Sequence, residues 1–281
     1  MINIQTEKNI HLISSDKHDF LADAFYPQNG ENLPLIIFAH GYKGYKDWGA
    51  WDLMAEKFAK AGFYFVKFNF SHNGTTVEEP NNFADLEAFG NNNYSREMAD
   101  FEEVVNYFTK TSRIDSSKIS IIGHSRGGGI AVLKAFEDDR IKALITLAGV
   151  SNFENRFVHG QQLEDWKNSG VIFSENKRTQ QQMPHFFQFF EDFKKNEKRF
   201  DIQKAAQNLE KPFLIIHGTA DEAVKIEEAY LLKKWCKTAE LALIENATHT
   251  FGAKEPWAAT TLPQELEKAV DESVEFLRRH L

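Results

Sequence analysis

The chain has 281 residues, of which 42% are hydrophobic and 26% are charged, a composition typical of ordinary globular proteins. Its net charge of −8 excludes the basic face that nucleic-acid-binding proteins need, so we expect no nucleic-acid partner. The single cysteine, Cys236, excludes an intrachain disulfide framework and fits a reducing compartment.

The N-terminal residues differ from the rest of the chain. Residues 2–15 and 18–27 resemble the two strands of an antiparallel hairpin, which we place at one edge of a sheet. No basic region leads into a continuous apolar stretch, so we expect no secretory signal. No apolar run approaches the roughly 20 residues of a membrane helix. We therefore expect a cytoplasmic protein without a membrane partner.

Short apolar runs alternate with amphipathic segments along most of the chain. Near-continuous apolarity is typical of strands that are covered on both faces, as in parallel sheets. The predicted strands are 34–41, 62–70, 118–125, 141–149, 212–218 and 240–246. The predicted helices are 47–62, 95–111, with Ser95 as its N-cap, and 262–281. This alternation predicts one α/β domain over residues 1–281, with a mostly parallel sheet and helices on both faces.

Residues 151–209 interrupt the alternation and contain no clear sheet strand. Because this segment is far longer than a usual connection, we predict an inserted lid or subdomain. Its stretch "MPHFFQFFEDF", residues 183–193, predicts a helix that is apolar nearly all round, as buried core helices are. The alternative is that part of it forms the wall of an acyl or aryl pocket. The candidate substrate-binding residues of the insert are Met183, Phe186, Phe187 and Phe190, with Arg178 as an anion clamp.

The stretch "GHSRG", residues 123–127, matches the pattern G-x-S-x-G directly after a predicted strand and before a predicted helix. A nucleophile at such a turn needs a strained backbone, and neighbours without side chains let the turn pack tightly. The positive end of the following helix adds free N–H groups beside the hydroxyl. Ser125 is therefore our candidate nucleophile, and an N-capping serine in a glycine-rich turn is the alternative.

A serine needs a base that takes its proton, and the base needs a partner that orients it. Asp221 follows the predicted strand 212–218, and His249 follows the strand 240–246. The order serine, acid, histidine matches the order required by the nucleophile-elbow motif. We predict that Ser125, His249 and Asp221 form a catalytic triad, with Glu222 as the competing acid.

A tetrahedral intermediate also needs hydrogen-bond donors for its oxyanion. The N–H of Arg126, which follows the nucleophile, is one candidate. The loop "FAHGYKGYKDWG", residues 38–49, follows an early strand and makes the N–H of Tyr42 the second candidate. The Arg126 guanidinium has two interpretations, an ion pair within the protein or a contact with an acidic substrate group.

Together, the segments "HGYKG", "GHSRGG", "HGTAD" and "ATHTF" resemble the α/β-hydrolase superfamily over nearly the whole chain. The chain is most similar to the dienelactone-hydrolase and prolyl-oligopeptidase-like branch, and within it to bacterial feruloyl (cinnamoyl) esterases and related carboxylesterases. This resemblance implies the two oxyanion donors named above and an inserted subdomain before the acid-bearing strand. Dienelactone hydrolases proper have a cysteine where this chain has Ser125. Feruloyl esterases often have glutamine where it has Arg126, which leaves the acyl group open.

We therefore predict a serine hydrolase that cleaves small-molecule carboxylic esters through an acyl-enzyme. The alternatives are a serine peptidase of the prolyl-oligopeptidase type and a non-catalytic protein that uses the hydrolase pocket to bind a ligand. We expect no cofactor and no metal, although His40, His217 and His249 all lie at predicted strand ends. The resemblance permits a homodimer.

Overall fold

The computed structural model describes residues 2–281 and contains an eight-stranded sheet in the order β1-β2-β4-β3-β5-β6-β9-β10. The strands are β1 (Ile4–Ile13), β2 (Asp19–Pro27), β3 (Leu33–Ala39), β4 (Tyr64–Phe68), β5 (Ile114–His124), β6 (Ile141–Leu147), β9 (Phe213–Gly218) and β10 (Ala239–Ile244). Strand β2 is antiparallel to β1 and β4, and the other neighbours are parallel. The predicted sheet, with its hairpin at one edge, is confirmed.

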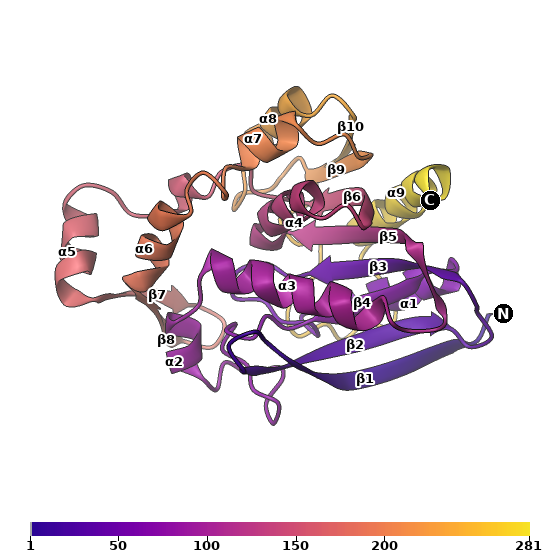
Figure 1. Cartoon of the computed structure of the whole chain (residues 1–281), viewed down its shortest axis with the longest axis horizontal. Coiled ribbons are helices and arrows are strands. Elements are labelled where there is room, and N and C mark those ends of the chain that lie inside the picture. The colour runs from indigo at the N-terminus through magenta and orange to yellow at the C-terminus, as the bar shows by residue number, and fades with distance from the viewer. Residues whose placement is uncertain (1) are drawn as a thin grey trace.

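Helices cover both faces of this sheet (Figure 1). One face carries α1 (Trp51–Lys60) and α9 (Gln264–His280), and the other carries α3 (Tyr94–Phe108), α4 (Arg126–Glu137), α7 (Ile202–Gln207) and α8 (Ile226–Trp235). Successive residues of β3 alternate between two cores: Leu35 and Ile37 belong to one, and Ile36 and Phe38 to the other. The strand is thus buried on both faces, which explains its continuous apolarity.

The start of α3 differs from the prediction by two residues. Its N-cap is Asn93, whose side-chain oxygen accepts a hydrogen bond from the N–H of Arg96. Ser95 lies inside the helix instead, and its hydroxyl donates to Asp192 at 2.6 Å. Asparagine is as good an N-cap as serine, so the short sequence "NNNYS" offers several starts that local preference alone does not separate.

Residues 151–209, which we call the insert, connect the neighbouring strands β6 and β9. The insert contains α5 (Gln161–Ser169), β7 (Val171–Asn176), β8 (Gln181–Phe186) and α6 (Gln188–Lys195), and ends with α7. The expectation that it has no strand was wrong, because β7 and β8 pair as an antiparallel hairpin apart from the main sheet. The expected helix over 183–193 begins only at Gln188, since pairing with β7 holds the preceding residues extended.

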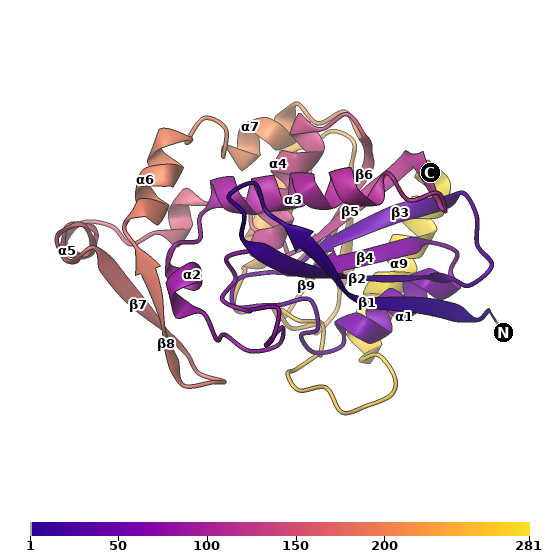
Figure 2. The ribbon, with the colours of Figure 1, turned by 60° about the horizontal axis from the view of Figure 1, so that its bottom comes forward.

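The hairpin β7–β8 and helices α5 and α6 lie at the end of the sheet toward which the parallel strands run, and both termini lie at the other end (Figures 1 and 2). Short helix α2 (Leu86–Gly90) lies beside β8. Within residues 2–281, the helices are too short or too polar to cross a membrane. The carboxyl ends of the parallel strands thus face the insert, and this edge is where α/β proteins place their sites.

Candidate active site

Ser125 occupies the sharp turn between β5 and α4. Its backbone has φ 56° and ψ −119°, a strained conformation that non-glycine residues rarely adopt. Both of its backbone groups are used: its N–H donates to the Leu147 carbonyl at 3.0 Å, and its own carbonyl accepts from Gly128 and Val150. These bonds hold the turn against β6, so the Ser125 side chain stands at the carboxyl edge of the sheet.

The glycines around Ser125 are required by close backbone approach. A Cβ at Gly123 would lie 2.2 Å from the Gly127 carbonyl oxygen, inside van der Waals contact. A Cβ at Gly41 would lie 2.8 Å from the Cβ of Ser125. The loop after β3 therefore packs directly on the serine turn, and both segments need glycine to do so.

The structure brings Ser125, His249 and Asp221 into one line of hydrogen bonds. Ser125 Oγ lies 3.0 Å from His249 Nε2, and His249 Nδ1 lies 2.8 Å from Asp221 Oδ2. The His249 side chain is 23% exposed, whereas that of Asp221 is fully buried. Since an ionised carboxylate only accepts hydrogen bonds, Nδ1 carries the proton and Nε2 is free to accept the serine hydroxyl. Glu222, the competing acid, is exposed beside Asp221.

Asp221 is fixed by several donors besides His249. Its Oδ1 accepts the N–H groups of Ala223 and Val224 at 2.8 and 2.9 Å. Burial by itself would raise the pKa of Asp221, but the hydrogen bonds from His217 and His249 outweigh it and hold this pKa well below the ordinary value. Asp221 is therefore a permanent anion that stabilises a positive charge on His249.

Three buried histidines, His40, His124 and His217, make hydrogen bonds at the strand ends. His124 Nε2 donates to the backbone carbonyl of His249 at 2.9 Å. His217 Nε2 donates to the Val224 carbonyl at 2.8 Å, in the loop that holds Asp221. His40 accepts the N–H of Phe70 and contacts the Gly41 carbonyl. Burial lowers the pKa of His124 to about 3 and that of His40 to about 4, so both rings are neutral.

Arg126 and Tyr42, whose N–H groups are the candidate oxyanion donors, lie close to the serine in the chain or in space. Arg126 is the first residue of α4, so its N–H is one of the four at the helix start without a partner inside the helix. Tyr42 follows Gly41, the residue that packs on Ser125. Both residues line the same cavity as Ser125 and His249. The geometry therefore brings together the residues that the sequence suggested for the triad and for the oxyanion donors.

A cavity of about 610 Å³ opens over Ser125 and is enclosed mainly by the insert. Its apolar lining consists of Tyr42, Tyr94, Val150, Phe153, Phe157, Val158, Trp166, Ile172, Phe173, Phe189, Ala223 and Val224. Its remaining lining residues are Ser125, Arg126, Arg156, Ser174, His185 and His249. This volume and aromatic lining are typical of sites for small organic ligands.

The five substrate-binding candidates of the insert do not line this cavity. They are Met183, Phe186, Phe187, Phe190 and Arg178. Met183 is fully buried in a separate aromatic cluster with Tyr45, Phe83 and Phe89. For Met183 and Phe186 the reason is the hairpin, because pairing with β7 holds them in a strand and not in the expected helix. Phe189 of α6 lines the cavity in place of the five candidates.

The remaining candidates also have structural partners. Phe187 and Phe190 pack against Trp166, on the insert's own core. Phe186 lies against Gly90 of α2, where its ring would be 2.8 Å from an added Cβ. The Arg178 guanidinium lies 5.7 Å from the centre of the Tyr45 ring.

Sequence reasoning missed two contacts between the insert and the loop that carries Tyr42. The Tyr42 hydroxyl lies 2.6 Å from His185 Nε2 on β8. Lys43 Nζ donates to Ser174 Oγ at 2.8 Å and to the Glu175 carbonyl at 2.7 Å, both on β7. Burial lowers the pKa of His185 to about 3, and repulsion from Arg126 and Lys43 adds to this effect. His185 is therefore neutral, and the hairpin holds the Tyr42 loop through it.

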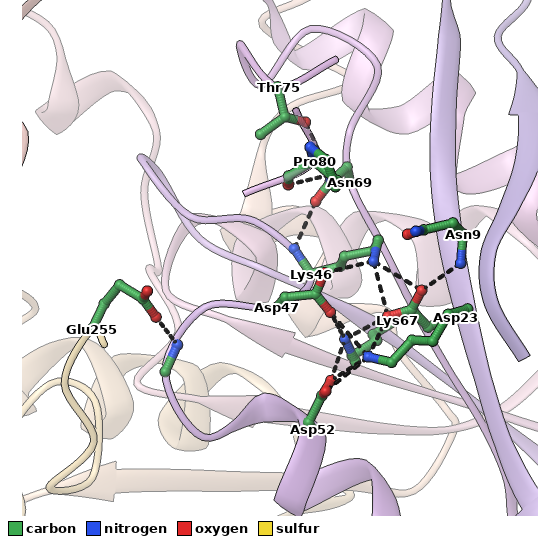
Figure 3. Close-up of polar contacts among 12 residues, drawn as sticks. Asn9, Asp23, Lys46, Asp47, Asp52, Lys67, Asn69, Thr75, Pro80 and Glu255 are labelled. Atoms are coloured by element: carbon green, nitrogen blue, oxygen red, sulfur yellow. Dashed lines mark hydrogen bonds and ion pairs between the residues drawn. The ribbon is translucent and has the colours of Figure 1, made fainter. Parts of the chain in front are cut away.

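The same loop is tied to the sheet by a network of charged side chains (Figure 3). Its members are Lys8, Asp23, Lys46, Asp47, Asp52 and Lys67. The three aspartates have oxygens within 4.8 Å of one another, a spacing that a metal ion would accept. The ammonium groups fill this role instead: Lys46 and Lys67 each contact Asp23 at 2.8 Å. Three positive charges balance three negative ones, so the network anchors the loop at no net charge.

An α/β sheet with a serine, a histidine and an aspartate at its carboxyl edge defines an α/β-hydrolase. The chain belongs to the prolyl oligopeptidase family, whose model matches residues 52–267. It superposes on Est1E from Butyrivibrio proteoclasticus with bound ferulic acid at a TM-score of 0.72, with 19% identity over 96% of this chain and 98% of the other.

Two curated relatives are similar over part of the chain. The uncharacterized peptidase YuxL of Bacillus subtilis (strain 168) is 30% identical over 167 residues, which are 58% of this chain and 23% of YuxL. Cutinase 1 of Thermobifida cellulosilytica is 30% identical over 124 residues, 44% of this chain and 42% of the cutinase. The matched segments thus span less than half of either relative.

Proposed function

We propose that this protein hydrolyses carboxylic esters of small molecules through an acyl-enzyme formed on Ser125. The observation that supports it most directly is the hydrogen-bonded line from Ser125 through His249 to Asp221, open to an aromatic cavity. Two names among the similar proteins agree with ester hydrolysis: a cutinase is among the relatives, and a ferulic acid complex is among the similar structures.

In the proposed acylation step, His249 Nε2 takes the Ser125 proton while Oγ attacks the ester carbonyl carbon. The imidazolium that forms is stabilised by the Asp221 carboxylate, which stays ionised. The N–H groups of Tyr42 and Arg126 donate to the oxyanion, and each such donor contributes about 10²–10³ in turnover. The ester C–O bond then breaks, and His249 gives the proton to the alcohol oxygen that leaves. In deacylation, water attacks the acyl carbon, with His249 again as the base, and Ser125 is regenerated.

The test is the hydrolysis of p-nitrophenyl acetate and butyrate by the wild type and by Ser125→Ala. We expect kcat to fall by about 10⁴-fold or more, with an unchanged circular dichroism spectrum. Ser117→Ala, at an exposed serine near the start of β5, is the matched control and should keep full activity. Labelling by a fluorophosphonate probe should require Ser125. Equal turnover by wild type and Ser125→Ala would end the proposal, and absence of both labelling and turnover in the wild type would favour a non-catalytic binding protein.

A peptidase is the second candidate, because the family and one relative bear that name. The enclosed cavity of about 610 Å³ favours a small acyl group over an extended peptide. Assays of dipeptidyl nitroanilides beside nitrophenyl esters separate the two. Faster cleavage of the anilides, relative to their lower intrinsic reactivity, would reverse the assignment.

A further inference from the structure

The side chain that follows the nucleophile is an arginine, and its guanidinium lies within the wall of the cavity. The Arg126 Cζ atom lies 4.4 Å from the centre of the Tyr42 ring, 5.3 Å from that of Phe189 and 5.7 Å from that of Tyr94. All three rings line the cavity, and only 16% of the Arg126 side chain is exposed. A positive charge is thus held among aromatic faces, next to the reacting serine.

The ion pair of Arg126 with Glu97 leaves much of the guanidinium's hydrogen-bonding capacity unused. Arg126 Nη1 lies 3.3 Å from Glu97 Oε1, which is long compared with the 2.7–2.9 Å typical of charged pairs. The same oxygen also accepts from Asn92 at 2.8 Å, and the buried Oε2 of Glu97 has no partner among the described residues. A guanidinium has five N–H donors, so this single long contact leaves donors available to a ligand.

The charges around the cavity favour an anion. Two arginines, Arg126 and Arg156, and no aspartate or glutamate are among its lining residues within the described chain. Arg156 is paired with Glu228 on α8. Burial lowers the pKa of Lys43, beside the cavity, and repulsion from Arg126 adds to this effect. The positive charge of Arg126 thus still acts on Lys43, although Glu97 is paired with Arg126.

We propose that the Arg126 guanidinium binds a carboxylate of the substrate, so that the preferred esters carry an anionic group separated from the ester by an apolar spacer. The inference rests on the proposed ester hydrolysis. The ester carbonyl lies at Ser125 and the spacer lies along the aromatic lining. The carboxylate, on the acyl or the alcohol side, takes the donors that Glu97 leaves free. Arg126 then has two roles: its N–H contacts the oxyanion, and its side chain selects the substrate.

The test compares kcat/KM for anionic and neutral esters of equal length, measured by acid release at constant pH. Monomethyl esters of dicarboxylic acids with four to nine carbons place the carboxylate on the acyl side. Acetyl esters of ω-hydroxy acids place it on the alcohol side. Methyl esters of monocarboxylic acids and alkyl acetates are the neutral matches. We expect the best anionic ester to exceed its neutral match by about 10- to 100-fold, the range of a buried charged hydrogen bond.

Two substitutions should move this preference in opposite directions. Arg126→Gln should abolish it, and Glu97→Gln should enlarge it, because Glu97 no longer competes for the guanidinium. Arg199→Gln, an arginine paired with Glu137 outside the cavity, is the matched control and should leave the preference unchanged. If Arg126→Gln alone does not fold, because it leaves Glu97 buried without a counter-charge, the double variant Arg126→Gln/Glu97→Gln removes both charges and serves instead.

The outcomes separate this inference from the proposed function. Neutral esters hydrolysed as fast as every anionic match would overturn the carboxylate subsite and leave ester hydrolysis standing. The same follows if Arg126→Gln lowers kcat/KM equally for both classes, since the ion pair is then only structural. A wild type that hydrolyses neither class, p-nitrophenyl acetate included, would overturn the proposed function and this inference with it.

Discussion

The sheet edge and the insert hold their functional groups by different means. At the sheet edge, Ser125 is fixed through backbone hydrogen bonds to β6 and the segment that follows it, and Asp221 through two backbone N–H groups. In the insert, His185 and Ser174 reach the Tyr42 loop through side chains. The first arrangement depends on the course of the chain itself, and the second on individual side chains that can be exchanged without altering the fold.

This difference separates the reaction from its selectivity. The groups proposed to make and break bonds follow β5, β9 and β10, and the sheet, in which β6 separates β5 from β9, sets the spacing of these strands. Most of the aromatic lining comes from the insert or from side chains that pack on it. Substitutions at the sheet edge should therefore abolish turnover or folding, whereas those in the insert should alter rates by smaller factors.

The largest expected effect is that of Asp221→Asn. The asparagine oxygen would keep the N–H groups of Ala223 and Val224, so its NH₂ would face His249 Nδ1. The ring must then carry its proton on Nε2, where it cannot accept the Ser125 proton. We expect kcat for nitrophenyl esters to fall by about 10⁴-fold with little change in KM. Glu222→Gln, at the exposed neighbour, is the control. A larger loss in the control would show that Glu222 is the acid.

Two glycine substitutions compare the regions directly. Gly123→Ala places a Cβ 2.2 Å from a backbone oxygen, so we expect it to lower the free energy of unfolding by at least about 4 kcal/mol. Gly170→Ala, between α5 and β7, meets no atom within 4 Å and has only the cost of a φ of +75°, about 1 kcal/mol. Denaturant-induced unfolding measures both. Equal losses of unfolding free energy in the two variants would contradict the expected difference between the closely packed backbone around Ser125 and the insert.

Two buried groups, Asp100 on α3 and His185 in the insert, should change the pH dependence of the protein's stability in opposite directions. Asp100 of α3 accepts both donors of Ser71, and burial raises the pKa of Asp100 to about 7. Because the folded state keeps this proton longer than the unfolded chain, the contribution of Asp100 to the free energy of unfolding falls as pH rises from about 4 to 7. Asp100→Asn should remove this slope, worth on the order of a few kcal/mol.

His185 in the insert should contribute a pH dependence of stability with the opposite sign. Its pKa is lowered to about 3, so the unfolded chain takes up the proton first, and stability is lost as pH falls below about 6.5. His185→Gln should reduce this loss. Unfolding curves between pH 4 and 8 for both variants and the wild type check the two signs, and matching slopes in the two variants would refute them.

The smallest effect is expected at the contact between the insert and the Tyr42 loop. Tyr42→Phe and His185→Phe each remove the hydrogen bond of 2.6 Å, and each should lower kcat by about 3- to 10-fold. In the double variant the losses should not multiply, since both substitutions delete one interaction. Steady-state kinetics on the four proteins measure the coupling. Independent losses would mean that His185 does not position the loop.

Much of the fold follows from the sequence because its signals are local. Continuous apolar runs such as 34–41 and 212–218 need only burial on both faces to be recognised as strands. The turn at Ser125 could be predicted because its glycines and its place after a strand allow few other conformations. Asp221 and His249 could be proposed because parallel strands end at one edge.

The insert could not be predicted in the same way. Whether Met183 and Phe186 belong to a strand or a helix is decided by pairing with Val171–Ser174, a contact that no local pattern reveals. The roles of His185 and Phe189 depend on which side of the hairpin or helix faces Ser125. The pattern "HFFQFF" marked the segment as apolar but did not rank its aromatic residues.

The hydrogen bonds between the hairpin β7–β8 and the Tyr42 loop have a consequence for engineering. Exchanging the insert for that of a homologue is an obvious way to transplant a new substrate range onto this scaffold. Such a chimera would lose the partners of Tyr42 and Lys43, and with them two supports of the segment that carries a proposed oxyanion donor. The insert should therefore be exchanged together with residues 41–45, so that both sides of these contacts come from the same protein.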